Sequence, residues 1–244
     1  MSDSITYEHP LSEKIRSYLR IEYLADQIIY YRNFDDNNGF KPFFDLLFSL
    51  ADLVDRGEIK KDLIRDLEHQ EHSLKQWLNA ENIDNQQLKK LLAQIESFSF
   101  NQPQSNKAQQ LINNDPLLAQ VKNKLALPGG GCHFDTPLLH YWQHLPISER
   151  QRNIEQWLEP FNMTVEAVRL LLHLLRESVT FEDKVANAGF FQSNCDKNQL
   201  LRIKIDIHQA CYPNVSGYRN RYAIRFSPWT DQPVHDIKFA VACC

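Results

Sequence analysis

The spacing of apolar residues changes about four fifths of the way along the chain. Up to about residue 190 they recur every three or four positions, which predicts amphipathic helices, and from about Asn198 they alternate with polar residues, which predicts strands. We therefore expect an α+β fold, with a mainly α-helical domain at 1–190 and a small antiparallel β domain at 191–244. Residues 4–8 are a further candidate strand, which would join the sheet.

Helix starts and stops are marked by prolines, caps and one glycine. Asp115-Pro116 predicts a helix start, with Asp115 as the N-cap, and Gly57 predicts the end of a helix that Pro42 begins. Thr164 is interpreted as the cap of a separate last helix. The predicted helices begin near Pro10, Pro42, Glu58, Asp84, Pro116, Pro137, Ser148 and Val165, and a polar connection follows the fourth, at 97–106.

Three segments alternate with a period of two: 201–208, 216–226 and 236–241. Each has one apolar side, so the pattern predicts an antiparallel sheet laid against the helices. In the second segment the alternation places Arg219, Arg221 and Arg225 on one face. The aromatic and aliphatic residues of that segment, Tyr218, Tyr222, Ile224 and Phe226, fall on the opposite face.

The outward face of this sheet is expected to be basic, in a chain whose net charge is −4. Six cations are predicted to point outward, against only Asp206 and Asp236. Such a face favours a partner that carries acidic groups. The six are Arg202, Lys204, Arg219, Arg221, Arg225 and Lys238.

Composition fits one large domain or two modest ones, because 43% of the 244 residues are hydrophobic. No targeting segment is recognised at the start, and no run of about 18 apolar residues occurs, so a cytoplasmic protein without membrane insertion is expected. The five cysteines are odd in number and lack zinc-ribbon spacing, which favours reduced thiols. The final Cys243-Cys244 pair is interpreted as the end of a strand rather than a prenylation signal.

Candidate catalytic and metal-binding motifs are weak. The turn at 128–131, Pro-Gly-Gly-Gly, lacks the Gly-Lys-Ser/Thr ending of a phosphate-binding P-loop. Cys132, His133, His140 and His144 are the best metal candidate, and a metal-dependent enzyme using them is one hypothesis, but their spacing matches no familiar zinc signature. We expect no cofactor, no bound metal and no catalytic activity.

Three arginines on the predicted helices leave two interpretations open. Arg16 and Arg20 are four residues apart and share a helix face, so an acidic group is expected opposite them. It is either internal, from Glu13 or Glu22, or it belongs to a partner. Arg56 is either a partner-binding residue or a cation that favours the C-terminal helix dipole before Gly57.

Several motifs together resemble the ZapD family, the Z-ring-associated protein D of bacterial cell division. They are residues 7–20 (YEHPLSEKIRSYLR), 55–58 (DRGE), 127–137 (LPGGGCHFDTP) and 212–217 (YPNVSG). The resemblance runs in the same order from Glu8 to Cys244.

The resemblance implies a non-enzymatic, homodimeric adaptor that binds the C-terminal tail of the tubulin-like protein FtsZ. It would bundle FtsZ filaments and promote Z-ring assembly and septation at mid-cell. The family's binding residues fall on Arg16, Arg56, His140, Arg221 and Arg225 in this sequence; Arg20 and Arg219 are added from their spacing.

A nucleic-acid-binding protein that uses the basic sheet face is the alternative hypothesis. Stacking on bases by Tyr218 and Tyr222 would support it. However, the alternation places these tyrosines on the face opposite the arginines, so no nucleic-acid partner is expected.

Overall fold

The computed structural model describes residues 3–32, 40–77, 85–98, 107–194, 199–218, 221–230 and 235–244. It confirms the α+β fold class. The chain divides into two compact units, one formed by residues 1–19 with 172–244 and the other by residues 20–171. Two helices, α1 (Glu13–Tyr31) and α8 (Ile147–Glu177), each have residues in both units.

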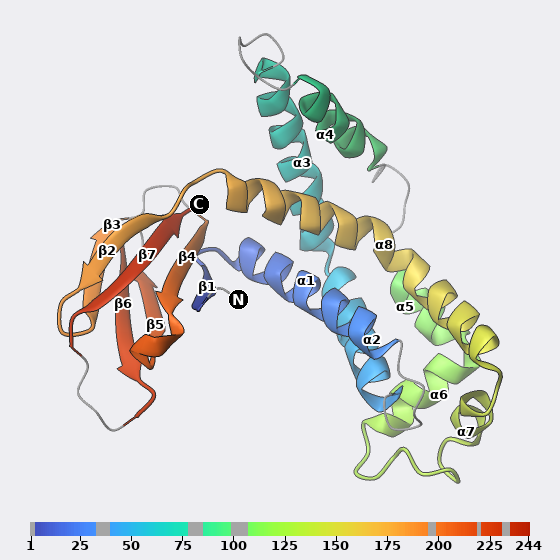
Figure 1. The fold of residues 1–244 in the computed structure, drawn as a ribbon. Helices are drawn as coiled ribbons and strands as arrows, with labels where there is room; N and C mark the ends of the chain where they lie inside the picture. The colour runs from blue at the N-terminus through green and yellow to red at the C-terminus, as the bar shows by residue number, and fades with distance from the viewer. Residues whose placement is uncertain are drawn as a thin grey trace. The chain divides into compact units, whose positions relative to one another are not determined.

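The first unit holds two antiparallel sheets (Figure 1). The four-stranded sheet, sheet A, has the order β1-β4-β7-β2, and the three-stranded sheet, sheet B, has the order β3-β6-β5. The candidate strand at the N-terminus does join sheet A, where it pairs with β4. The strands are β1 (Ser4–Pro10), β2 (Glu182–Ala186), β3 (Phe190–Asn194), β4 (Leu200–Asp206), β5 (Cys211–Tyr218), β6 (Arg221–Pro228) and β7 (Ile237–Cys243).

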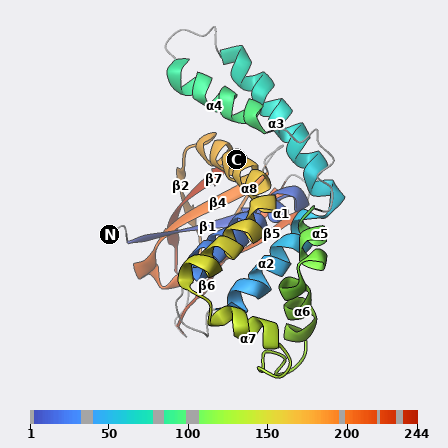
Figure 2. The ribbon, with the colours of Figure 1, turned by 90° about the vertical axis from the view of Figure 1, so that its right-hand side faces the viewer.

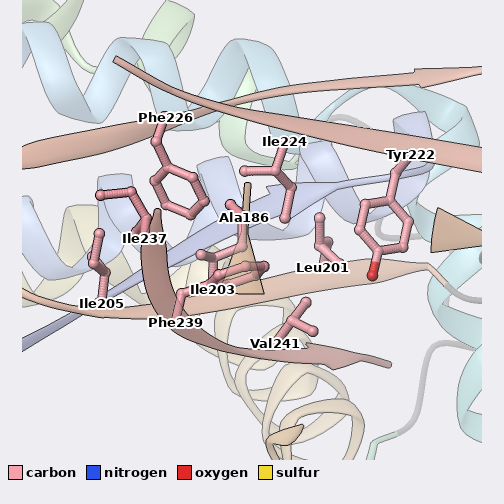
Figure 3. Packing of buried hydrophobic residues seen from close by; sticks show 10 residues of the cluster. All are labelled: Ala186, Leu201, Ile203, Ile205, Tyr222, Ile224, Phe226, Ile237, Phe239 and Val241. Atoms are coloured by element: carbon pink, nitrogen blue, oxygen red, sulfur yellow. The ribbon is translucent and has the colours of Figure 1, made fainter. Parts of the chain in front are cut away.

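The two sheets share one hydrophobic core. Figure 3 shows the apolar side chains of β6 pointing towards those of β4 and β7. The expectation of a single sheet packed on helices is therefore wrong: the strands bury their apolar faces against a second sheet. The core residues are Ala186, Leu201, Ile203, Ile205, Tyr222, Ile224, Phe226, Ile237, Phe239 and Val241.

The segment predicted as one strand at 216–226 belongs to two strands. Its first residues end β5 and its remainder, from Arg221, lies in β6, which pairs antiparallel with β5. Arg219 lies outside the described residues, together with Asn220. Turn-forming Ser216-Gly217 does not break β5, because pairing with β6 continues to Tyr218.

The second unit is helical (Figure 2). The α3–α4 pair forms a hairpin of two helices lying side by side, visible in both Figure 1 and Figure 2. Besides parts of α1 and α8, the helices are α2 (Phe40–Val54), α3 (Gly57–Trp77), α4 (Asn85–Ser97), α5 (Lys107–Asn114), α6 (Pro116–Leu125) and α7 (Pro137–Gln143).

Asp115 connects two helices of this unit. Its Oδ1 accepts hydrogen bonds from the backbone N–H groups of Leu117 and Leu118, at 2.8 and 3.0 Å, which confirms the predicted N-cap. Its Oδ2 accepts the indole N–H of the buried Trp157 on α8, at 2.9 Å. One carboxylate therefore caps α6 and satisfies a buried donor.

Two helix boundaries differ from the prediction. Pro160 lies inside α8, which is continuous, so Thr164 is not a cap. Phe161 and Val168, beyond the proline, are buried, and this burial favours an unbroken helix over the cost of one lost backbone hydrogen bond. Gly57 begins α3 instead of ending α2, and it does not adopt the positive φ expected of a C′ glycine.

The predicted domain boundary between 190 and 191 also differs from this division. Strand β2 and the start of β3 come before that boundary, and β1 and the start of α1 belong to the β unit although they begin the chain. At the other end, Cys244 is buried and its N–H donates to the carbonyl of Leu200 at 2.8 Å, as expected for a strand end.

Replacing Ile224 by alanine tests whether the two sheets depend on their shared core. Ile224 is fully buried in that core, so Ile224→Ala is expected to lower the free energy of unfolding by about 2–5 kcal/mol. The matched control is Val185→Ala on β2, where 47% of the residue is exposed and the expected loss is below about 1 kcal/mol. Guanidinium titration measures both, and equal losses would contradict the shared core.

Candidate functional site

The candidate site is the outward face of sheet B. On β6 the side chains of Tyr222, Ile224 and Phe226 are at most 4% exposed, because they form part of the core. Alternation along the strand then places Arg221 and Arg225 on the outward side, where both are exposed. The prediction that these two arginines share a solvent-facing side is confirmed.

This face carries no carboxylate among the residues that the structure describes. Neither Arg221 nor Arg225 makes an ion pair or side-chain hydrogen bond with a described residue. Register with β6 defines the rest of the face. The outward residues are Phe190, Gln192 and Asn194 on β3, Arg221, Ala223, Arg225 and Ser227 on β6, and Tyr212, Asn214 and Ser216 on β5.

Spacing along β6 separates the two guanidinium groups. Four residues of strand correspond to about 13 Å, at about 3.3 Å per residue. Ala223 lies between the arginines with only a methyl group. The face therefore has one cation on each side of a small central residue. This arrangement suits an extended ligand with two separated acidic groups.

The outward face of sheet A is different. Arg202 lies 3.4 Å from Glu8 through its Nε and stacks against the Phe181 ring, 4.9 Å from its centroid. Glu8 also accepts two hydrogen bonds from Arg176, at 2.9 and 2.7 Å. The charges of Glu8, Arg176 and Arg202 are therefore largely paired with one another.

Two more cations of sheet A, Lys204 and Lys238, line an open hollow of about 590 Å³ together with Asp183 and Asp206. Opposite charges are therefore mixed on this side. The single basic face expected from the sequence is wrong: its cations are divided between two sheets, and only the sheet B face has cations without carboxylates among its described residues.

Arg16 and Arg20 lie on α1, one in each unit. The Arg16 Nε is 3.1 Å from Glu13 Oε1, which agrees with the internal interpretation, but Glu13 is 86% exposed and such pairs are weak. Arg20 is exposed and has no ion pair with a described residue. Arg16 is also near His9, whose pKa is lowered by burial and by the Arg16 charge.

The segment before α1 lies beside the β5–β6 hairpin. A side chain added at Gly217 would come within 3.7 Å of both the Leu11 side chain and the Arg221 carbonyl. The start of α1 is thus near the strand that carries Arg221, within the same unit. Gly217 pairs with the buried Tyr222, and Leu11 packs against the same core, so this contact lies on the inward side of sheet B and does not place Arg16 on the outward face.

Arg56 lies between two helices, after the end of α2 and directly before the first residue of α3. Its carbonyl accepts the N–H of Ile59, as at a helix start. Arg56 also follows the last turn of α2, where its N–H donates to the Leu53 carbonyl at 3.4 Å. A cation is favourable at the C-terminal end of α2 and unfavourable at the start of α3, so both interpretations of Arg56 stay open. Its side chain is exposed and has no ion pair with a described residue.

His140 lies on α7 between two other histidines. The His133 ring stacks on it at 3.8 Å between centroids, and the His144 ring meets it edge-on at 4.6 Å. The His144 Nδ1 donates to the His140 carbonyl at 2.8 Å. Nδ1 of His140 is buried and has no hydrogen-bond partner among the described residues.

The metal candidate from the sequence was the set Cys132, His133, His140 and His144. Within the described ranges, no group of three or more His, Cys, Asp or Glu side chains is arranged to hold a metal ion. Burial, and then the His133 and His144 rings, lower the pKa of His140 below its ordinary value of 6.5. His140 is therefore neutral at pH 7, where it can donate or accept a hydrogen bond but supplies no charge.

The structure brings only part of the predicted site together. Arg221 and Arg225 share one face, and Arg16 belongs to the same unit. Arg20, Arg56 and His140 belong to the helical unit, and the positions of the two units relative to one another are not determined. The sequence did not single out Phe190 or Tyr212, whose strands it missed; only the alternation around Tyr212 and Asn214 signals an outward row.

Comparison with known proteins identifies similar sequences over the whole chain. A family model described as ZapD, cell division protein, matches residues 19–225. A curated protein from Vibrio atlanticus, named "Cell division protein ZapD", is 38% identical to this chain over 240 residues, which cover 98% of both chains. The protein of that name in Escherichia coli O9:H4 is 33% identical over 247 residues, covering 100% of both.

No helix in the part of the chain that the structure describes is long and apolar enough to cross a membrane.

The histidine stack predicts a titration that NMR can follow. His140 should titrate below pH 6.5, and the double variant His133→Gln/His144→Gln should raise its pKa, because a neighbouring positive charge is removed. Since the folded pKa is lowered, the unfolded chain takes up the proton more readily. Stability from neutral His140 is therefore complete well above pH 6.5 and is lost as the pH falls below 6.5 and through the lowered pKa of the folded state.

The histidine Cε1–H shifts measure these pKa values directly. A His140 pKa at or above 6.5, unchanged in the double variant, would show that the ring stack has no electrostatic effect.

Proposed function

The chain belongs to the ZapD family of cell division proteins, and we propose that it is an adaptor that binds the C-terminal tail of FtsZ and crosslinks FtsZ filaments. It would act as a non-enzymatic homodimer in the cytoplasm at mid-cell, where bundling would stabilise the Z-ring. Membership of the family supports the role in cell division. Binding to the FtsZ tail, the homodimer and the mid-cell location are proposed.

One observation carries the proposal: Arg221 and Arg225 are exposed and unpaired among described residues, on a face without a described carboxylate. A guanidinium group can donate two parallel hydrogen bonds to one carboxylate. Hydrogen bonds to charged groups contribute about 1.5–3 kcal/mol each, and less when exposed. Two such contacts give a modest affinity for an acidic peptide.

Crosslinking follows from repetition. A two-fold dimer presents the same face twice, and an FtsZ filament presents its tail at every subunit. Binding of a second tail is then favoured by a high effective concentration, so weak single contacts can hold two filaments together. Arg16, Arg20, Arg56, His140 and Arg219 are proposed as further residues that bind the tail.

The nucleic-acid alternative is less well supported. Tyr222 is only 4% exposed and packs in the core, so it has no free ring face for stacking on a base. Tyr218 was the second tyrosine of that hypothesis, and its side chain lies outside the described residues. Among the described residues, the outward face of sheet B has two arginines, which are few groups to neutralise a run of phosphates, and the net charge of the chain is −4.

Charge reversal on β6 tests the site. Titration of a labelled FtsZ tail peptide with Arg221→Glu and Arg225→Glu is expected to show affinity weaker by about 10–100-fold for each variant, because a charged contact is replaced by repulsion. The matched control is Lys204→Glu, which makes the same charge change on the outward face of sheet A. It should bind within about threefold of the unchanged protein.

Added salt should weaken peptide binding by the unchanged protein and by the control to the same extent. The amount of bundled FtsZ filament that pellets with each variant should rise and fall with its affinity for the peptide. If Arg221→Glu and Arg225→Glu are folded, as confirmed by circular dichroism, and bind the peptide as tightly as the unchanged protein, the assignment of the site is overturned. Absence of binding by the unchanged protein would overturn the proposed partner.

A further inference from the structure

Aromatic side chains stand beside the arginines on the outward face of sheet B. Phe190 is 47% exposed and Tyr212 is 40% exposed, although neighbouring outward positions on their strands are polar. The residue after Phe190 is Phe191, which faces inward and packs edge-on against Phe239 at 5.2 Å. The core therefore uses one phenylalanine of the pair, and packing does not account for the other.

Register places both rings near Arg225. Phe190 is its direct cross-strand neighbour on β3, and such neighbours have Cβ atoms about 4.5–5.5 Å apart. On β5, Tyr212 pairs with Ser227 of β6 and so lies diagonally from Arg225. At that separation its ring can reach the Arg225 side chain. Asn214, directly opposite Arg225 on that side, donates to Ser227 at 2.8 Å and is held by that bond.

A third ring follows the end of β6. Trp229 is 80% exposed, and its backbone N–H donates to the backbone carbonyl of Ala210 at 2.7 Å. That bond keeps the Trp229 backbone next to the start of β5, two residues before Tyr212. Single exposed aromatics are common, but Phe190 and Tyr212 lie together beside an arginine that has no ion pair with a described residue, which indicates a surface that binds apolar groups.

The two arginines have different surroundings. Arg221 has Asn194 as its neighbour on β3, and no ring from that strand reaches it. Between the arginines, Ala223 is flanked by Gln192 and Ser216, which are polar and short or flexible. Among the described side chains of this face, the exposed rings lie at the Arg225 end.

We infer that the outward face of sheet B recognises an extended acidic peptide that also carries apolar side chains, with Phe190 and Tyr212 as specificity-determining residues beside Arg225. The inference rests on the proposed function and deepens it. An extended peptide advances about 3.3 Å per residue, so carboxylates about four residues apart reach both guanidinium groups. An apolar side chain near one of them covers the Phe190 and Tyr212 rings and excludes water from the Arg225 contact, which strengthens it.

The test separates ring contacts from charge contacts. Phe190→Ala and Tyr212→Ala are expected to weaken binding of the FtsZ tail peptide about 5–30-fold each, with the dependence of log affinity on log salt unchanged. Arg225→Gln should weaken binding and also flatten that dependence. Val185→Ala, which truncates an equally exposed apolar residue on sheet A, should leave both quantities unchanged.

A second peptide completes a double-mutant cycle. When serine replaces the apolar residues of the tail and its carboxylates are kept, the unchanged protein and Phe190→Ala should bind it equally. If the unchanged protein binds the natural tail but Phe190→Ala and Tyr212→Ala bind it as tightly, the inference fails while the proposed function stands. If the unchanged protein does not bind the tail, the proposed function itself fails.

An oligonucleotide of twelve nucleotides serves as competitor at 150 mM salt. Failure to displace the tail is expected, because two separated arginines neutralise few phosphates. Displacement that depends on Phe190 would overturn the peptide class and assign the face to nucleic acid.

Discussion

The two sheets of the β unit depend on one constraint: they bury their apolar faces against each other. Successive side chains of a strand point to opposite faces, so the burial of Tyr222, Ile224 and Phe226 leaves Arg221 and Arg225 no other direction than outward. A one-residue slip of β6 would bury two charges and expose three large apolar side chains, at a cost of several kcal/mol for each buried charge. The core therefore sets the position of the cations as well as the stability of the sandwich.

The same constraint gives the two outward faces different chemistry. On sheet A, Glu8 accepts hydrogen bonds from Arg176 and lies beside Arg202, so an ion-pair network joins β1, β4 and the end of α8. On sheet B, the arginines lie among amide, hydroxyl and aromatic side chains, with no described carboxylate nearby. One face uses its charges to hold its own elements together, and the other leaves them available to a partner. The proposed crosslinking of filaments requires such an available surface.

The spacing of apolar residues was sufficient to predict those helices and strands that have one apolar side and one polar side. It predicted most of the helices, the α+β class and the outward direction of Arg221 and Arg225, but it missed α5 and β2. It missed β3, where two successive phenylalanines hide the alternation, and β5, where Pro213 and Gly217 weaken the signal of a strand. It also divided α8 at a proline that the buried residues around it override. The histidine stack and the exposed ring of Phe190 depend on which strands and loops meet in space, and local sequence does not encode that.

We propose that the alternation of β6, fixed by the shared core, creates the surface that binds an acidic tail. Amide chemical-shift mapping of the isotope-labelled protein, titrated with unlabelled FtsZ tail peptide, tests this binding surface most directly. We expect the largest shifts within the β unit to lie along β6 from Arg221 to Arg225 and on the facing residues of β3 and β5, with little change on β4 and β7. Shifts centred on the hollow beside Lys204 and Lys238, with sheet B unchanged, would contradict it.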